Sequence, residues 1–276
     1  MMKFIGMAFL MSFSLCVMAQ SIQIKDIYFK EGYHFDHTDP NNFRLIYKIA
    51  SRNPNTSLFR KIDFDTLLSI TDTTLINMGG SYRLITSASN HRYTATLFAS
   101  TSPAHMVLHI LGEHNYKRSI IFQTKVPWKK KMTFYLISSA DPGVFYILYP
   151  FDKKNWEIQC VSVDDKVLWK KEISGGNEKL TLSYPFIVDQ RLVVLASLSP
   201  LKNKESHALH VIDPQSGNII STLPIAGQYE RNTVDNVFFQ DSTMFITGRK
   251  FFTRGTSDKA NGMPYVKFIR VRGYGI

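Results

Sequence analysis

The sequence predicts an all-β fold, a β-propeller of about five four-stranded blades. Short apolar runs alternate with polar turns along most of the 276 residues. The same order of strands and turns recurs with a period of roughly fifty residues, as expected of a repeat architecture. The clearest turns carry Asp, Pro and Gly where a tight reversal of the chain needs them.

The first expected element is a signal peptide over Met1–Ala19. It has one lysine, then an apolar run and small residues before a cleavage site expected between Ala19 and Gln20. The apolar run is too short for a comfortable transmembrane span. Cys16 raises the alternative of a lipoprotein, which the bulky Leu15 before it disfavours. The mature chain is therefore predicted to be exported, either periplasmic or secreted.

The repeated unit is clearest in Tyr184–Ile225. Asp189–Arg191 and Asp213–Gly217 predict turns, and the apolar runs beside them predict four antiparallel strands: Pro185–Val188, Leu192–Leu198, Ala208–Ile212 and Asn218–Leu223. The same pattern, aligned by eye, makes 20–276 one propeller domain. Its blades are expected at about 33–80, 81–130, 131–178, 179–228 and 229–276.

The last unit lacks an outer strand, because the chain ends soon after Val266–Arg272. Residues Ile22–Phe29 alternate apolar and polar, as a half-buried strand does. We expect this N-terminal strand, within 21–30, to complete the last blade and close the ring, which removes two exposed edges. The alternative is that the chain is a fragment of a longer propeller.

Two segments carry a family resemblance: LHVIDPQSG, over 209–217, and VDDKVLW, over 163–169. They resemble the PQQ-like or WD40-like propeller repeat. The resemblance implies a fold and no particular activity. Similar repeats occur in quinone-cofactor dehydrogenases and in non-enzymatic scaffolds of the bacterial envelope. The enzymes have eight blades as a rule, and this chain has room for about five or six, so no cofactor is expected.

The composition limits the partners. The formal net charge is +11, but export argues against nucleic acid. The anionic partners outside the cytoplasm are lipid headgroups, acidic glycans and acidic proteins, and the alternative is a generally basic, solvated surface. Cleavage leaves Cys160 as the one cysteine, so no internal disulfide is expected. Cys160 lies within an expected strand, where a packed thiol is the simplest interpretation.

The basic residues gather in the loops of one face. In a propeller, the loops that join second to third strands, and one blade to the next, share a face. In this chain these loops are the long ones, and the first of them is expected at Ala50–Asp63. Their Lys and Arg residues are Arg52, Arg60, Lys61, Lys129, Lys130, Lys131, Lys153, Lys154, Lys202, Lys204, Arg231, Lys250, Arg254 and Lys259. Long loops on a rigid scaffold commonly carry binding sites. The candidate binding residues are Trp128, Lys129, Lys130, Lys131, Lys153, Lys154, Tyr229, Arg231 and Arg254.

The sequence gives less support to catalytic or metal-binding residues than to binding residues. Asp39, Asp141, Asp189 and Asp241 recur after the first strand of each unit, where Asp caps a turn through the backbone two residues on. His34, Asp36, His37 and Asp39 cluster, but they lack the defined spacing of a zinc site. His105 and His109 are about 13 Å apart along a strand and cannot share a metal. No catalytic or metal-binding residue is therefore assigned.

Two classes of function remain. The first is a non-enzymatic binding or scaffolding module outside the cytoplasm, which engages an anionic or protein partner through the basic long-loop face. The alternative is a carbohydrate-active enzyme or lectin-like domain with a site at the axial mouth. Convergent carboxylates in one axial pocket would favour the enzyme.

Overall fold

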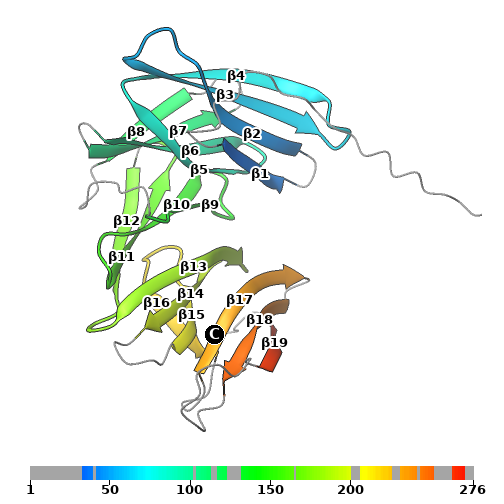
Figure 1. Cartoon of the computed structure of the whole chain (residues 1–276), viewed down its shortest axis with the longest axis vertical. Helices are drawn as coiled ribbons and strands as arrows, with labels where there is room; N and C mark the ends of the chain where they lie inside the picture. Colours follow the sequence, from blue (N-terminus) through cyan, green and yellow to red (C-terminus); the bar gives the residue numbers. More distant parts are fainter. Residues whose placement is uncertain are drawn as a thin grey trace, which may run out of the picture.

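The computed structural model describes residues 33–39, 42–101, 104–112, 117–122, 132–164, 166–199, 206–225, 231–240, 243–251 and 263–270. Within these ranges the chain forms strands β1 to β19 and no helix, so they contain no helix that could cross a membrane. The strands form five antiparallel sheets in chain order (Figure 1). The predicted all-β propeller of about five blades is confirmed.

Four sheets have four strands each, paired as simple meanders. The first contains β1 (Tyr33–Asp39), β2 (Asn42–Ile49), β3 (Thr56–Asp65) and β4 (Ile70–Gly79). The second contains β5 (Tyr82–Ser89), β6 (Tyr93–Thr101), β7 (Ala104–Gly112) and β8 (Lys117–Phe122). The third contains β9 (Tyr135–Ser138), β10 (Val144–Pro150), β11 (Asn155–Ser162) and β12 (Lys166–Ser174). The fourth contains β13 (Lys179–Val188), β14 (Arg191–Ser199), β15 (Ser206–Ile212) and β16 (Ile219–Pro224).

The fifth sheet has three strands among the described residues: β17 (Arg231–Gln240), β18 (Thr243–Phe251) and β19 (Met263–Arg270). The segment expected to complete it, Ile22–Phe29, lies outside the described residues. Closure of the ring by this segment therefore stays a prediction.

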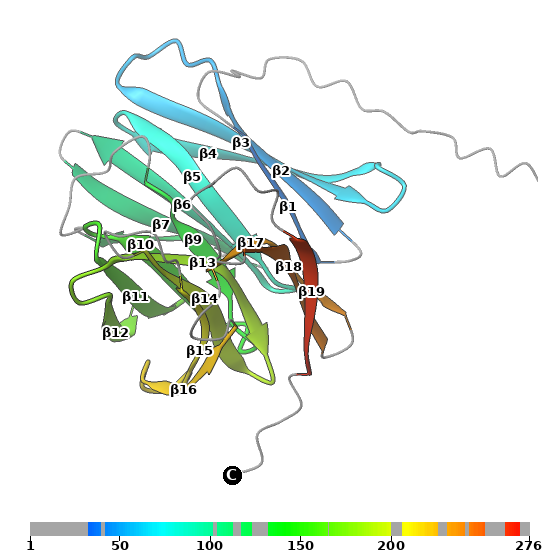
Figure 2. The same ribbon diagram turned by 60° about the horizontal axis from the view of Figure 1, so that its bottom comes forward.

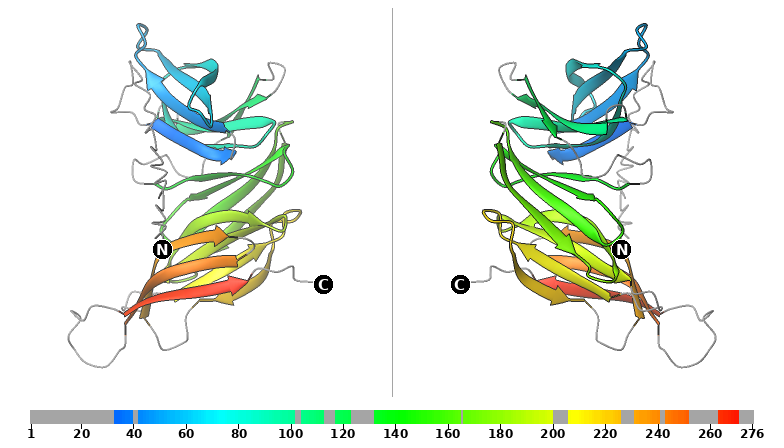
Figure 3. Two further views of the ribbon diagram at one scale, coloured as in Figure 1. Left: turned by 90° about the vertical axis from the view of Figure 1, so that its right-hand side faces the viewer. Right: turned by 90° about the vertical axis from the view of Figure 1, so that its left-hand side faces the viewer.

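The sheets follow one another along the molecule, with β1–β4 at one end and β17–β19 at the other (Figures 1 and 3). Figure 2 shows the same sheets fanned out in chain order. The first strands of successive sheets lie side by side: β1 contacts β5, β5 contacts β9, and β9 contacts β13. In a propeller the first strand of each blade lines the axis, so this arrangement fixes which loops belong to each face.

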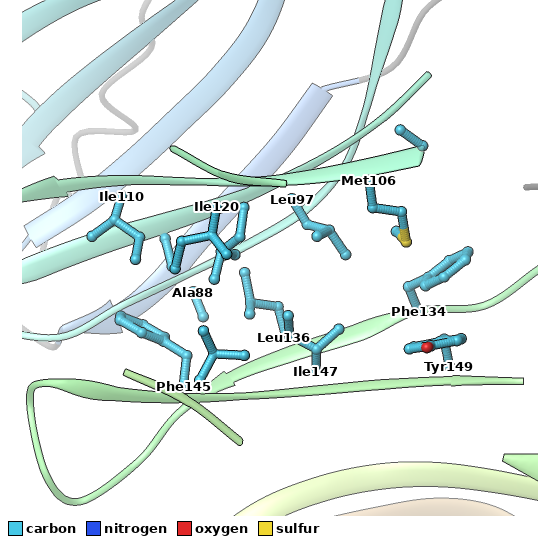
Figure 4. Packing of buried hydrophobic residues seen from close by; sticks show 14 of the residues in the cluster. Ala88, Leu97, Met106, Ile110, Ile120, Phe134, Leu136, Phe145, Ile147 and Tyr149 are labelled. Carbon is cyan, nitrogen blue, oxygen red and sulfur yellow. The ribbon is translucent and has the colours of Figure 1, made fainter. Parts of the chain in front are cut away.

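Each pair of neighbouring sheets encloses its own apolar cluster. Between the second and third sheets, Ile110 faces Phe145 and Leu97 faces Ile147, and all four are fully buried (Figure 4). Similar clusters lie between the first and second, third and fourth, and fourth and fifth sheets. The strands of the third sheet alternate strictly, so β10 sends Ile147 to one cluster and Leu148 to the next. Burial on both faces explains why middle strands such as β10 and β14 read as nearly continuous apolar runs.

The units also share their irregularities. A register shift interrupts the pairing of the first strand in the first, second, fourth and fifth sheets. Another interrupts the outer hairpin of the first, third and fourth sheets. In the fourth sheet, β13 begins at Lys179, earlier than the expected Pro185. The strand tolerates Pro185, which has no N–H to donate, because the residue lies at the register shift between Ser183 and Phe186.

Candidate functional site

The structure describes two of the nine candidate binding residues with their side chains. Lys153 and Lys154 lie in the loop between β10 and β11 on the long-loop face, and both are exposed. Arg231 is the first residue of β17, and only its backbone is described. The remaining candidates lie outside the described residues: Trp128, Lys129, Lys130, Lys131, Tyr229 and Arg254.

Hydrogen bonds fix the backbone that carries the two lysines. The Asp152 carboxylate accepts the N–H groups of Lys154 and Asn155 at 2.6 and 2.8 Å. The carbonyl of Lys153 accepts the N–H of Leu180 at 3.1 Å, and that of Lys154 accepts the N–H of Gly175 at 2.8 Å. The loop is therefore tied to the start of the next blade. Burial is slight at Asp152, and hydrogen bonds from Asn155 and the backbone hold its pKa below the ordinary value.

The two lysines present their charges to solvent. No salt bridge joins either ammonium group to a carboxylate in the described part of the chain. The Asp152 charge lies nearby, but its oxygens are occupied by the turn. Two adjacent ammonium groups on a fixed loop are suited to contact an extended anionic surface, where each acts as a point charge.

The expectation that Arg60 and Lys61 lie in the long loop is wrong. Both belong to β3, because the loop ends at 55 and the strand starts at Thr56. Lys61 is 6% exposed and pairs with Asp63 at 2.7 Å and Asp72 at 3.2 Å. The charged side chains satisfy one another across β2, β3 and β4, since Arg44 also pairs with Asp63 at 2.6 Å. This network stabilises the first sheet and does not contribute to the basic face.

Three of the groups considered for chemistry, Asp141, Asp36 and His105, have local hydrogen-bond partners. Asp141 Oδ1 accepts the Gly143 N–H at 2.8 Å, which is the turn-capping role expected from its position. Asp36 is buried and accepts a hydrogen bond from Ser89 at 2.5 Å. The His105 ring is 2.7 Å from the Tyr82 hydroxyl. Within the described ranges, no three His, Cys, Asp or Glu residues come together as a metal site.

A buried carboxylate that the sequence reasoning did not single out lies in the third sheet. Glu157 is 1% exposed and accepts hydrogen bonds from Tyr149 and from Gln159, the latter at 2.7 Å. Lys170 approaches it to 3.0 Å. Burial acts to raise the pKa of Glu157, but the bonds from Tyr149, Gln159 and Lys170 outweigh it and lower the pKa. A satisfied and enclosed carboxylate stabilises the sheet and cannot reach a ligand in solution.

The sequence reasoning also missed a cavity of about 590 Å³ between the third and fourth sheets. It lies on the face of the short turns, opposite the basic loops, since its lining includes residues of the β9–β10, β13–β14 and β15–β16 turns. Its lining residues are Ser139, Ala140, Asp141, Val144, Tyr146, Cys160, Leu168, Trp169, Gln190, Pro214 and Gln215. Drug-sized ligands occupy pockets of this volume.

No family model matches the chain, and no curated protein matches it. Among solved structures, a Synechocystis apocarotenoid oxygenase mutant is 8% identical with a TM-score of 0.49, covering 80% of this chain and 56% of that chain. The β-propeller domain of the Trilobed protease from Pyrococcus furiosus is 10% identical with a TM-score of 0.47, covering 87% of this chain and 84% of that one. A GH43 β1,3-galactosidase with galactodeoxynojirimycin is 10% identical with a TM-score of 0.41, covering 88% and 95%.

The chain spans about half the length of the apocarotenoid oxygenase structures that it matches, 52% to 56%. At these TM-scores the likenesses add nothing to the fold that the strand topology already gives, and they assign no activity to this chain.

Proposed function

We propose that the chain is an exported, non-enzymatic binding or scaffolding propeller that engages an anionic partner through its basic long-loop face. The partner is an acidic protein or acidic glycan outside the cytoplasm. The observation that carries the proposal is the pair Lys153 and Lys154, exposed on a loop that hydrogen bonds fix to the next blade. The sequence adds further basic residues to loops of the same face, including Lys129, Lys130 and Lys131.

The proposed location outside the cytoplasm rests on the N-terminal sequence. A lysine, an apolar run and small residues before Gln20 are typical of a cleaved signal peptide. An exported domain with one remaining cysteine has to depend on its core for stability, and the four inter-sheet clusters supply such a core.

We also propose that the repeats of this propeller are PQQ-like. This assignment is supported by the way in which two residues of the resembling segments, Trp169 and Gly217, meet between neighbouring sheets. A Cβ at Gly217 would lie 2.5 Å from the Trp169 ring. The indole N–H donates to the Pro214 carbonyl at 2.7 Å. The two segments thus form one contact between successive units.

The experiment is heparin binding by Lys153→Glu/Lys154→Glu, compared with the unmodified chain over a range of salt concentrations. We expect affinity to fall roughly tenfold at low salt, because two exposed charges are reversed. Binding of the unmodified chain should weaken as salt screens the contacts. The matched control is Arg92→Glu/Lys166→Glu, which reverses the same number of exposed charges on the short-turn face. Equal losses in both double variants would show that only net charge matters and would contradict the proposal.

A further inference from the structure

The cavity between the third and fourth sheets has a fixed shape. Its floor is made by Tyr146 and Cys160, each 1% exposed. Its outer wall, β12, is tied to the β15–β16 turn by two hydrogen bonds across the sheets: Trp169 Nε1 to the Pro214 carbonyl at 2.7 Å, and Lys171 Nζ to Asn218 Oδ1 at 2.8 Å. The walls therefore cannot close without breaking contacts that hold two blades together.

The lining carries one formal charge, and it is negative. Asp141 Oδ1 is held by the turn, whereas Oδ2 has no hydrogen-bond partner in the described part of the chain. Burial is the main cause that raises the pKa of Tyr146, and the charges of Asp141 and Asp213 also act to raise it. Burial and the Asp141 charge raise the pKa of Cys160 to about 12. Hydrogen bonds from Ser216 and Gln215 lower the pKa of Asp213, and the Arg191 charge lowers it to a smaller extent. Arg191 does not line the cavity.

A ligand would also meet neutral donors and acceptors at the mouth. The side chains of Ser139, Gln190 and Gln215 line it. Gln190 adopts φ 65° and Asp189 φ 46° in the two-residue turn between β13 and β14. Such a turn favours Asn followed by Gly, so Gln190 is strained relative to glycine at this position. Strain of this kind commonly accompanies a functional side chain.

The aromatic residues restrict the ligand further. The Trp169 ring is covered by Gly217 on one side and packs against Tyr146, with ring centroids 5.8 Å apart. Gly217 therefore closes one face of the indole to a stacking sugar ring. The remaining wall is aliphatic, from Val144, Leu168 and Pro214. These features fit a ligand with a cationic head for Asp141 and an apolar body.

We propose that this cavity binds an organic cation, an ammonium or guanidinium group attached to an apolar portion. Asp141 pairs with the cation, Gln190 and Gln215 hydrogen-bond to it, and Val144, Leu168 and Pro214 contact the apolar portion. A free amine and an arginine side chain of a peptide share this chemistry. The site is independent of the basic face, because the two lie on opposite faces and attract opposite charges.

The test uses calorimetric titration of the whole chain with matched pairs of probes. One pair is acetyl-Leu-Arg-Leu-amide and the same peptide with citrulline, the neutral isostere of arginine, and the other is phenethylamine and phenethyl alcohol. We expect the cationic member of at least one pair to bind and its neutral partner to bind about tenfold more weakly. Binding by the peptide alone identifies a peptide ligand, and binding by the amine alone identifies a small molecule.

Variants assign the site. Asp141→Asn keeps the oxygen that accepts the Gly143 N–H, so the turn should persist while cation binding falls about tenfold. Asp164→Asn is the control, since Asp164 is exposed in a turn of the same face and does not line the cavity. Gln190→Gly should raise the urea midpoint and weaken binding.

Cys160 reports on occupancy, because its thiol lies at the cavity floor. A bound cation should slow its reaction with a small organomercurial, and Cys160→Ser identifies the signal from this thiol. Equal affinity for the charged and neutral probes, equal effects of the two Asp variants, or no binding of any probe in the millimolar range would overturn the proposal.

Discussion

Replacing Gly217 with alanine should destabilise the contact between the third and fourth blades. Gly217 adopts φ 71°, and a left-handed conformation costs an L-residue about 1 to 2 kcal/mol. The new Cβ would also lie 2.5, 2.6 and 3.0 Å from three atoms of the Trp169 ring. No Cβ tolerates such distances, so the ring has to move.

Movement of the ring would cost two further interactions. The Trp169 N–H would lose the Pro214 carbonyl, at about 1 to 2 kcal/mol for a partly buried donor. The ring would also lose part of its packing on Tyr146, at roughly 1 kcal/mol for an aromatic pair. With the backbone cost included, we expect Gly217→Ala to lower the free energy of unfolding by roughly 3 to 5 kcal/mol.

The control is Gly176→Ala. Gly176 has nearly the same φ, 65°, but nothing lies within 4 Å of its added Cβ. This variant should therefore lose only the backbone component, about 1 to 2 kcal/mol. The assay is urea unfolding followed by tryptophan fluorescence, in which the difference between the variants corresponds to roughly 1 M in the midpoint. Equal midpoints for Gly217→Ala and Gly176→Ala would refute the reasoning.

Three further predictions concern pH, closure and export. Burial, with a smaller effect of the Lys117 charge, lowers the pKa of His109 to about 4. Because the unfolded chain binds this proton more tightly, the free energy of unfolding should fall as pH drops from about 6.5 to 4. Urea midpoints measured over this pH range should fall less for His109→Gln. Deleting Gln20–Lys30 should lower the free energy of unfolding by several kcal/mol if this segment closes the ring, which would appear as a lower urea midpoint. An unchanged midpoint would indicate an open or differently closed array. Mass spectrometry of the exported protein should show a mature N-terminus at Gln20, and an uncleaved or lipid-modified chain would contradict this.

The parts of the fold that depend on local sequence were predictable. Asp213–Gly217 predicts its turn because Pro and Gly occupy positions that few other residues satisfy. The apolar runs beside such turns predict the strands, and their recurrence predicts the five sheets. The expected strand for β13 began too late, at Pro185, because only the continuous apolar run was counted. Lys179–Ser183 alternates polar and apolar residues, as a half-buried strand does. The pairing of β13 with β14 depends on a register that only the folded sheet supplies.

The candidate sites were less predictable, because they depend on contacts between distant segments. Lys61 resembles a loop residue in sequence, and only the pairing of β3 with β4 brings it to Asp72. The cavity forms because Trp169 packs on Gly217 of the next blade. The repeat alignment contained a signal for this contact, since one unit has the tryptophan and the next has the glycine. Alignment alone does not show that the two residues meet.

The most direct test of the central proposal is lysine acetylation with and without bound heparin, followed by mass spectrometry of peptides. Lys153 and Lys154 are exposed on the long-loop face, whereas Lys166 is exposed on the short-turn face. If the long-loop face binds the anionic partner, heparin will protect Lys153 and Lys154 and leave Lys166 as reactive as before. Equal protection of all three lysines, or protection of Lys166 alone, would contradict the proposal.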